Sequence, residues 1–441
     1  MDRTLAEAIV STLEVSRASQ ARFARLESFP PRAWKQTLPW LDRSGLALYF
    51  LQQLRDARAE KMIPAEARRR LARNFDANLQ RVGEMTEEFR TLNRGLEAAG
   101  IEYAVLKGFS LIPDYCPDAC LRTSYDFDYL LHPESLGEVH RVLMAAGYVF
   151  GREAEGHRVY VQAKNPCRLP SSLEESYSAQ LGREAELHFR LWNTAEEKIH
   201  LEPPGDPLRR AQRRTWNGCA FQTLSDVDQL IFQGLHAFWH MLHGGCRLSN
   251  LYEVARFLAG RSSDSGFWGG VREQLEVRRE LGQALGVVFL LTTSLYGGEV
   301  PAEVRPDTTA GLAPARRLWV ERYGRDLAFR NFSGNKFGLF LHREFLEDGA
   351  AWREIRRRRL FPLHRSSRAA QGSAHLFSPG VSREVRGYMF RWLASRLLGP
   401  VGYAFEWPRW HWLRRKTLRA SRAAQAPLAV PNPYLEASKR P

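Results

Sequence analysis

Residues 122–131 constrain the fold of this chain more than any other segment. In their sequence, RTSYDFDYLL, the acidic residues Asp126 and Asp128 alternate with the aromatic residues Phe127 and Tyr129. An alternation of period two that is rich in aromatic and aliphatic residues is typical of a β-strand. Because residues i and i+2 of a strand point to the same side, both carboxylates project from one face. The segment therefore predicts a strand that displays two neighbouring aspartates.

The pair Asp126 and Asp128 indicates either a divalent metal site or a solvated surface strand. Two carboxylates at this spacing repel each other, so the pKa of one rises unless a cation lies between them. Mg²⁺ relieves the repulsion, since it accepts one or two protein carboxylates together with phosphate oxygens. A surface strand with two solvated aspartates has the same pattern, so the neighbouring motifs decide between the two interpretations.

A candidate phosphate-binding turn lies upstream of this strand. Residues 101–106, IEYAVL, predict a short buried strand that runs directly into KGFS, where Lys107 and Gly108 precede Ser110. A glycine lets the backbone approach a phosphate closely, and free N–H groups with an ammonium group attract the anion. Arg122 could add a guanidinium group at the same edge, although an exposed loop arginine is equally compatible with the sequence.

A third carboxylate follows on a later strand. Residues 184–191, EAELHFRL, alternate polar and apolar side chains, which places Glu186 and His188 on one polar face. Between the two acidic strands, the sequence predicts a helix over residues 133–146 and a strand over residues 157–162. This β-α-β-β order predicts a small mixed sheet with carboxylates from two strands at one edge. Three carboxylates around two metal ions, beside a glycine turn, are suited to in-line attack on a nucleotide α-phosphate.

These motifs together resemble a known family. The similar segments are LKG (106–108), Tyr115, LR (121–122), DFDYL (126–130), GY (147–148) and ELHFRL (186–191). They are similar to uncharacterised bacterial nucleotidyltransferases of the DNA polymerase beta-like superfamily. In that superfamily a Gly-Ser or related turn precedes Asp-x-Asp or Asp-x-Glu, and a third acidic residue follows. This chain departs from the pattern because no serine directly follows Gly108, and because the gap from Gly108 to Asp126 is longer than in the polymerases.

The resemblance implies an α+β fold, with a small mixed β-sheet nucleotidyltransferase core between N-terminal and C-terminal helical regions. It also implies an enzyme that uses Mg²⁺ or Mn²⁺ to transfer a nucleoside monophosphate from a nucleoside triphosphate, such as ATP, to a small molecule, sugar or protein. The implied catalytic and metal-binding residues are Asp126, Asp128 and Glu186, and the implied nucleotide-binding residues are Lys107, Gly108, Ser110, Arg122 and His188. A non-catalytic binding or scaffold protein on the same fold is the alternative. The presence of all three carboxylates favours the enzyme, because a decayed site usually loses one of them.

The chain of 441 residues is long enough for two to three domains and a sizeable core. We expect an N-terminal helical region over 1–99, the catalytic core over 100–200, a C-terminal helical region over 201–400 and a basic tail, rich in Trp, Arg and Pro, over 401–441. The polar loop of residues 165–182 could cover the nucleotide. Residues 201–215, which are rich in proline and then in basic residues, are expected to form a linker.

The C-terminal helical region carries two further groups of interest. His236, His240 and His243 share one face of a predicted helix. They could bind zinc together, line the catalytic cleft or pack in the core, and the apolar residues among them favour a largely buried helix. Downstream, Glu253 could orient the acceptor substrate or pair with Arg247.

The positive charge is concentrated near the C-terminus. Residues 351–441 contain 19 Lys and Arg against 4 Asp and Glu, which accounts for the whole net charge of +15. Interleaved Trp and Arg in residues 407–416 suit anionic lipid headgroups or nucleic acid, whereas tryptophans packed onto the domain are the alternative. Five cysteines without a Cys-x-x-Cys pair, and no signal-peptide pattern, predict a reduced cytoplasmic protein. Contact with the inner membrane would then be peripheral, through the tail, since no transmembrane segment is predicted.

Overall fold

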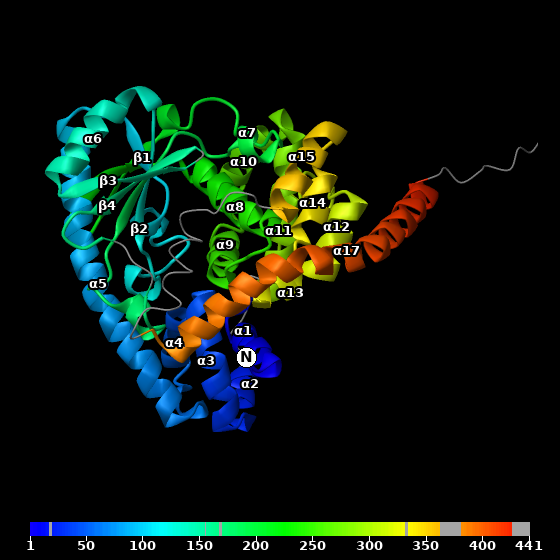
Figure 1. Cartoon of the computed structure of the whole chain (residues 1–441), viewed down its shortest axis with the longest axis horizontal. Coiled ribbons are helices and arrows are strands. Elements are labelled where there is room, and N and C mark those ends of the chain that lie inside the picture. The colour runs from blue at the N-terminus through cyan, green and yellow to red at the C-terminus, as the bar shows by residue number, and fades with distance from the viewer. Residues whose placement is uncertain (17–19, 155, 167–169, 331–333, 362–380, 426–441) are drawn as a thin grey trace, which may run out of the picture.

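A mixed β-sheet between two helical regions forms the fold (Figure 1). The computed structural model describes residues 1–16, 20–154, 156–166, 170–330, 334–361 and 381–425. This architecture confirms the predicted α+β class, with a mixed sheet flanked by helices on both sides. Cys167 and the Pro-rich residues 426–441 lie outside the described residues.

The N-terminal region is helical, as its apolar spacing predicts. Its α-helices are α1 (Arg3–Thr12), α2 (Gln20–Ala24), α3 (Pro31–Ser44), α4 (Ala47–Asp56) and α5 (Ala65–Ala98). Helix α5 has 34 residues and links this region to the sheet (Figure 1). Leu71, near its start, packs in the helical core, whereas Phe89, near its end, packs in the core beneath the sheet.

The sheet has seven strands in the order β3-β4-β5-β2-β1-β7-β6. The strands are β1 (Tyr103–Val105), β2 (Asp126–Leu131), β3 (Tyr148–Ala154), β4 (His157–Gln162), β5 (Glu184–His188), β6 (Gln212–Trp216) and β7 (Cys219–Thr223). β2 pairs in parallel with β5 and antiparallel with β1, while β1 pairs in parallel with β7. Helix α6 (Leu136–Ala145) connects β2 to β3.

The helices after β5 form most of the second helical region. They are α7 (Thr194–Glu197), α8 (Asp226–Leu242), α9 (Leu248–Gly260), α10 (Ser265–Val277), α11 (Arg279–Tyr296), α12 (Pro314–Trp319), α13 (Arg325–Arg330), α14 (Gly338–Glu344), α15 (Gly349–Leu360) and α17 (Arg383–Gln425). Helix α11 is buried along most of its length. Among the described residues, no helix is both long and apolar enough to span a bilayer.

The two faces of the sheet are covered by different helices. Phe127 and Tyr129 of β2 pack with Phe89 of α5 in one core, which α6 also covers. Leu130 points the other way and packs against Phe232 of α8. Because Asp126 and Asp128 have the same parity as Leu130, they face the side of the sheet that α8 covers.

Two parts of the sheet differ from the sequence prediction. β3 follows α6 directly and pairs with β4, although the sequence predicted no strand there. A register shift between Phe150 and Arg152 interrupts the alternation of side chains along β3. β6 begins at Gln212, within the segment that was expected to be a linker, and pairs with β7. Both are edge strands, and the polar sequence of β6 conceals its pairing.

Candidate active site

The parallel pairing of β2 with β5 brings the predicted acidic residues together. Asp128 lies opposite Glu186 in the register, while Asp126 lies opposite Glu184. All four residues have the parity that points away from the core under α5. The ladder therefore converts two local sequence motifs, far apart in the chain, into one acidic surface.

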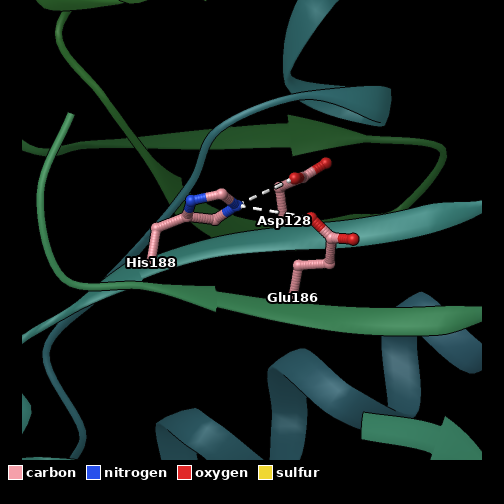
Figure 2. A group of neighbouring side chains, drawn as sticks. All are labelled: Asp128, Glu186 and His188. Carbon is pink, nitrogen blue, oxygen red and sulfur yellow. Dashed lines mark hydrogen bonds and ion pairs between the residues drawn. The ribbon is translucent and has the colours of Figure 1, made fainter. Parts of the chain in front are cut away.

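Asp128 is at the centre of this surface (Figure 2). Its Oδ1 atom lies 2.8 Å from Nζ of Lys107 and 3.1 Å from Nε2 of His188. The same His188 nitrogen lies 3.8 Å from Oε2 of Glu186. Asp128 is only 1% exposed, so these contacts replace water as the partners of its charge.

Burial and mutual repulsion shift the pKa values of these groups. Burial and the charge of Asp128 raise the pKa of Asp126, and burial with both aspartate charges raises that of Glu186 to about 7. Although burial opposes its charge, Asp128 has a lowered pKa because Lys107 and His188 stabilise the carboxylate. Burial also opposes the charge of Lys107, but the surrounding carboxylates raise its pKa. Asp126 and Glu186 therefore experience the repulsion that a bound cation would relieve.

The donor atoms fit a divalent cation. The Oδ2 atom of Asp128 is buried and makes no hydrogen bond within the described part of the chain. One ligand atom each from Asp128, Glu186 and His188 lie within 4.8 Å of one another. Carboxylate oxygens are the ligands that Mg²⁺ prefers, and an imidazole nitrogen is also accepted by transition metals. Asp126 lies outside this group but on the same face of β2.

The turn after β1 has the conformation that its glycine predicts. Gly108 has φ +68°, in the left-handed region, and a Cβ atom there would meet no other atom within 4 Å. The turn is therefore open to an approaching group. Phe109 stacks on Trp216 of β6, which anchors the turn to the sheet. Ser110 is buried, and its hydroxyl donates to the carbonyl oxygen of Lys107, so it shapes the turn, while its contact with a nucleotide stays a prediction.

Arg122 is held at the edge of the site by a buried carboxylate. Its Nε donates to Oε1 of Glu253 on α9 at 3.1 Å, and its Nη1 donates to the hydroxyl of Ser124. The hydroxyl of Tyr49 donates to the same carboxylate oxygen at 2.8 Å. Arg122 is thus no exposed loop arginine, and Glu253 pairs with it where the sequence had suggested Arg247.

One charged pair of the site has no signal in the sequence. Arg152 of β3 donates from both Nη atoms to the carboxylate of Glu184, at 2.9 and 3.1 Å. It also lies 3.9 Å from Oε1 of Glu186. Glu184 could have been found from its i, i+2 relation to Glu186, but Arg152 could not. Its contribution depends on the register of β3, β4 and β5.

His236 and His240 of α8 and its C-cap residue His243 do not converge on one point. Nε2 of His236 and Nε2 of His240 are 3.2 Å apart, whereas Nε2 of His243 lies 2.8 Å from Oε1 of Glu197. Burial, followed by the positive charge of Lys107, lowers the pKa of His236 well below its usual value. His236 is therefore a neutral group that is influenced by Lys107 and Asp128, while its place in a catalytic cleft stays a prediction.

A second cluster with metal-like spacing contains Glu196, Glu197 and His243. The guanidinium group of Arg359 on α15 donates to the Glu197 carboxylate and already supplies the positive charge. Arg359 also donates to the carbonyl oxygen of Leu242 at 2.8 Å. The cluster is therefore explained by ion pairing between helices and needs no metal.

One family model matches more than half of the chain. The family model described as "Uncharacterised nucleotidyltransferase" matches residues 30–297. No curated protein matches the chain. One similar solved structure is the crystal structure of an antigenic nucleotidyltransferase-like protein from Paracoccidioides brasiliensis. The alignment with it has 16% identity and a TM-score of 0.26, and it covers 44% of this chain and 89% of the other.

Proposed function

Because the chain belongs to the uncharacterised nucleotidyltransferase family, we propose that it is a metal-dependent enzyme that transfers a nucleoside monophosphate from a nucleoside triphosphate to an acceptor. The observation that carries this proposal is the pairing of Asp128 with Glu186 in one parallel ladder, beside Asp126 and Lys107. The acceptor class would be a small molecule, a sugar or a protein. We also propose ATP among the donors, Mg²⁺ or Mn²⁺ as the metal, and the cytoplasm as the location.

The residues of the site would divide the work between metal and nucleotide. Asp126, Asp128 and Glu186 would hold the cation, which when bound would neutralise the triphosphate and make the acceptor hydroxyl more acidic. Lys107 and the open backbone at Gly108 would bind the triphosphate. In the reaction, the acceptor oxygen forms a bond to the α-phosphorus, the bond to the pyrophosphate oxygen breaks, and the hydroxyl proton is released. Arg122 and His188 would position the phosphates at the edge of the site.

The proposal is tested by incubating the full chain with each labelled nucleoside triphosphate and Mg²⁺. We expect release of pyrophosphate or labelling of an acceptor, and a loss of about 10³-fold or more in Asp126→Asn and Asp128→Asn, since each removes a metal ligand. Glu134→Gln, at an exposed carboxylate after β2, is the matched control and should keep full activity. Activity that survives both aspartate substitutions would refute the assignment. Absence of any triphosphate binding would favour a non-catalytic binding or scaffold protein.

A second prediction concerns the residue that holds Arg122. Glu253 is 2% exposed and fixes the guanidinium group, so Glu253→Gln should let Arg122 move. We expect the KM for the triphosphate to rise about tenfold with a smaller change in kcat, since positioning of a phosphate contact is lost. Steady-state kinetics over a range of triphosphate concentrations measures both constants. Tyr49→Phe, which removes one hydrogen bond to Glu253, should have a smaller effect. An unchanged KM in both variants would show that Arg122 does not contact the nucleotide.

A further inference from the structure

Helix α17 runs along the outside of the fold (Figure 1), and one of its sides carries exposed apolar side chains. Leu397 is 74% exposed, Phe405 is 82% exposed, and Val401 and Trp412 are also more than half exposed. These residues follow the spacing i, i+4, i+8 and i+15, which places them on one side of a helix. Large apolar side chains that gather on one exposed face mark an interaction surface.

The opposite side of α17 is packed into the protein. Tyr403 stacks on Phe340 of α14, and Trp410 contacts both Phe340 and Tyr323. Tyr403 and Trp410 are almost completely buried. Trp410 is therefore packed onto the domain, which was one of the two predictions for these tryptophans, whereas Trp412, two residues later, is exposed. Because one face is already anchored, the exposed stripe is left over for a second partner rather than for the core of this chain.

The stripe continues into positive charge at the C-terminal end of the helix. Arg415, Arg419 and Arg422 are exposed and fall on the same side as Leu397, since 18, 22 and 25 residues are close to whole turns. Glu406 is the one acidic residue among the described side chains of α17. It lies on the packed side, where it accepts hydrogen bonds from Arg322 and Tyr323. The exposed side of α17 thus consists of an apolar segment followed by a cationic segment, and its described side chains include no acidic residue.

We propose that this face of α17 lies flat on an anionic lipid membrane. Leu397, Val401, Phe405 and Trp412 would enter the boundary between headgroups and acyl chains, while the arginines would bind the lipid phosphates. The end of α17 projects beyond the rest of the fold, so a planar surface can reach it (Figure 1). This inference is independent of the proposed transferase reaction, because no residue of the acidic site takes part.

Two other partners fit the face less well. Single-stranded nucleic acid binds through aromatic groups interleaved with cations. On this face the apolar residues, Phe405 and Trp412 among them, all precede Arg415, Arg419 and Arg422, so the two kinds of side chain are not interleaved. If two copies of the chain paired through this face, their arginines would be buried without an acidic partner. The described side chains on the face include no carboxylate, so neither a parallel nor an antiparallel arrangement of the two helices would supply one. A bilayer supplies both the apolar layer and the negative charge.

The test is co-sedimentation of the full-length protein with vesicles of phosphatidylcholine, with and without phosphatidylglycerol. We expect binding only to the vesicles with phosphatidylglycerol. The double variant Leu397→Ser/Phe405→Ser should bind at least about tenfold more weakly. Arg415→Gln/Arg419→Gln should bind about 30-fold more weakly, since each arginine near an anionic surface contributes about a factor of five.

Matched substitutions on other elements control for general changes in the surface. Val277→Ser on α10 removes an exposed apolar side chain, and Arg209→Gln removes an exposed charge. Both should bind vesicles like the unaltered protein. Equal binding by all variants, or none by the unaltered protein, would overturn the proposal. So would binding to single-stranded RNA in place of vesicles, or a dimer in analytical ultracentrifugation that Leu397→Ser/Phe405→Ser dissociates.

Discussion

Lys107→Met should destabilise the metal-free protein by about 3 kcal/mol, because it removes the buried cation that lies 2.8 Å from Asp128. The side chain of Lys107 is 11% exposed and that of Asp128 is 1% exposed, so water cannot replace the lost charge. Asp128, Asp126 and Glu186 would then repel one another without a positive partner. The free energy of unfolding of Lys107→Met should therefore fall most when no divalent cation is present.

Urea unfolding in EDTA and in excess Mg²⁺ or Mn²⁺ measures this effect. A divalent cation that binds between the carboxylates should stabilise Lys107→Met more than it stabilises the unaltered protein, and so narrow the difference. Lys35→Met, at an exposed lysine of α3, is the matched control and should change stability by no more than about 0.5 kcal/mol. If Lys107→Met has unaltered stability in EDTA, the buried ion pair does not hold the acidic strands together.

The acidic strands could be predicted from sequence because each has a local signal. The alternation around Asp126 and Asp128 predicts β2, and the alternation around Glu186 predicts β5. Both strands direct their aspartate and glutamate side chains to one face of the sheet, so the periodicity also indicates the side of the site. The expected β-α-β-β order placed both strands in one small mixed sheet with their carboxylates at one edge. Their direct parallel pairing is a finding of the structure.

Other features of the site depend on contacts between distant residues. Arg152 reaches Glu184 across β4, and Lys107 pairs with Asp128 in the structure, whereas the sequence indicated only an anion contact. The two residues of each pair are far apart in the sequence, so no short motif signals the contact. The register of the sheet brings them together. Trp410 and Trp412 show the same limit, because the helical turn that buries one indole exposes the other.

Glu197→Gln should cost about 3 kcal/mol of stability near pH 7, because it removes the charge that compensates Arg359 inside the protein. Glu197 is fully buried at the end of α7. It accepts hydrogen bonds from Trp239 at 3.0 Å and from His243 at 2.8 Å, and it also accepts one from Arg359 of α15. His342 of α14 donates to its backbone carbonyl oxygen. One carboxylate thus connects α7, α8 and α15, so its neutral isostere leaves a buried cation between them.

The pH dependence of stability distinguishes lost charge from lost packing. Burial opposes the charge of Glu197, but His243 and Arg359 hold its pKa well below the usual 4.5. The folded state therefore binds fewer protons than the unfolded state, and this contribution is present above about pH 4.5 and is lost as the pH falls below it. Burial and Arg359 also lower the pKa of His243 to about 4, from an unfolded value of 6.5, so its neutral form adds acid lability between these values.

Urea unfolding at about pH 7 and at about pH 4 should therefore show a smaller difference between Glu197→Gln and the unaltered protein at the lower pH. Glu196→Gln is the matched control, because it changes the neighbouring, partly exposed carboxylate in the same way. The hydrogen bond from Arg359 goes to the carboxylate of Glu197. Because Glu196 is partly exposed, its substitution should lower stability less than Glu197→Gln at both pH values. A difference for Glu197→Gln that stays constant from neutral to acid pH would mean that the substitution acts through shape, since a packing defect does not titrate with the carboxylate.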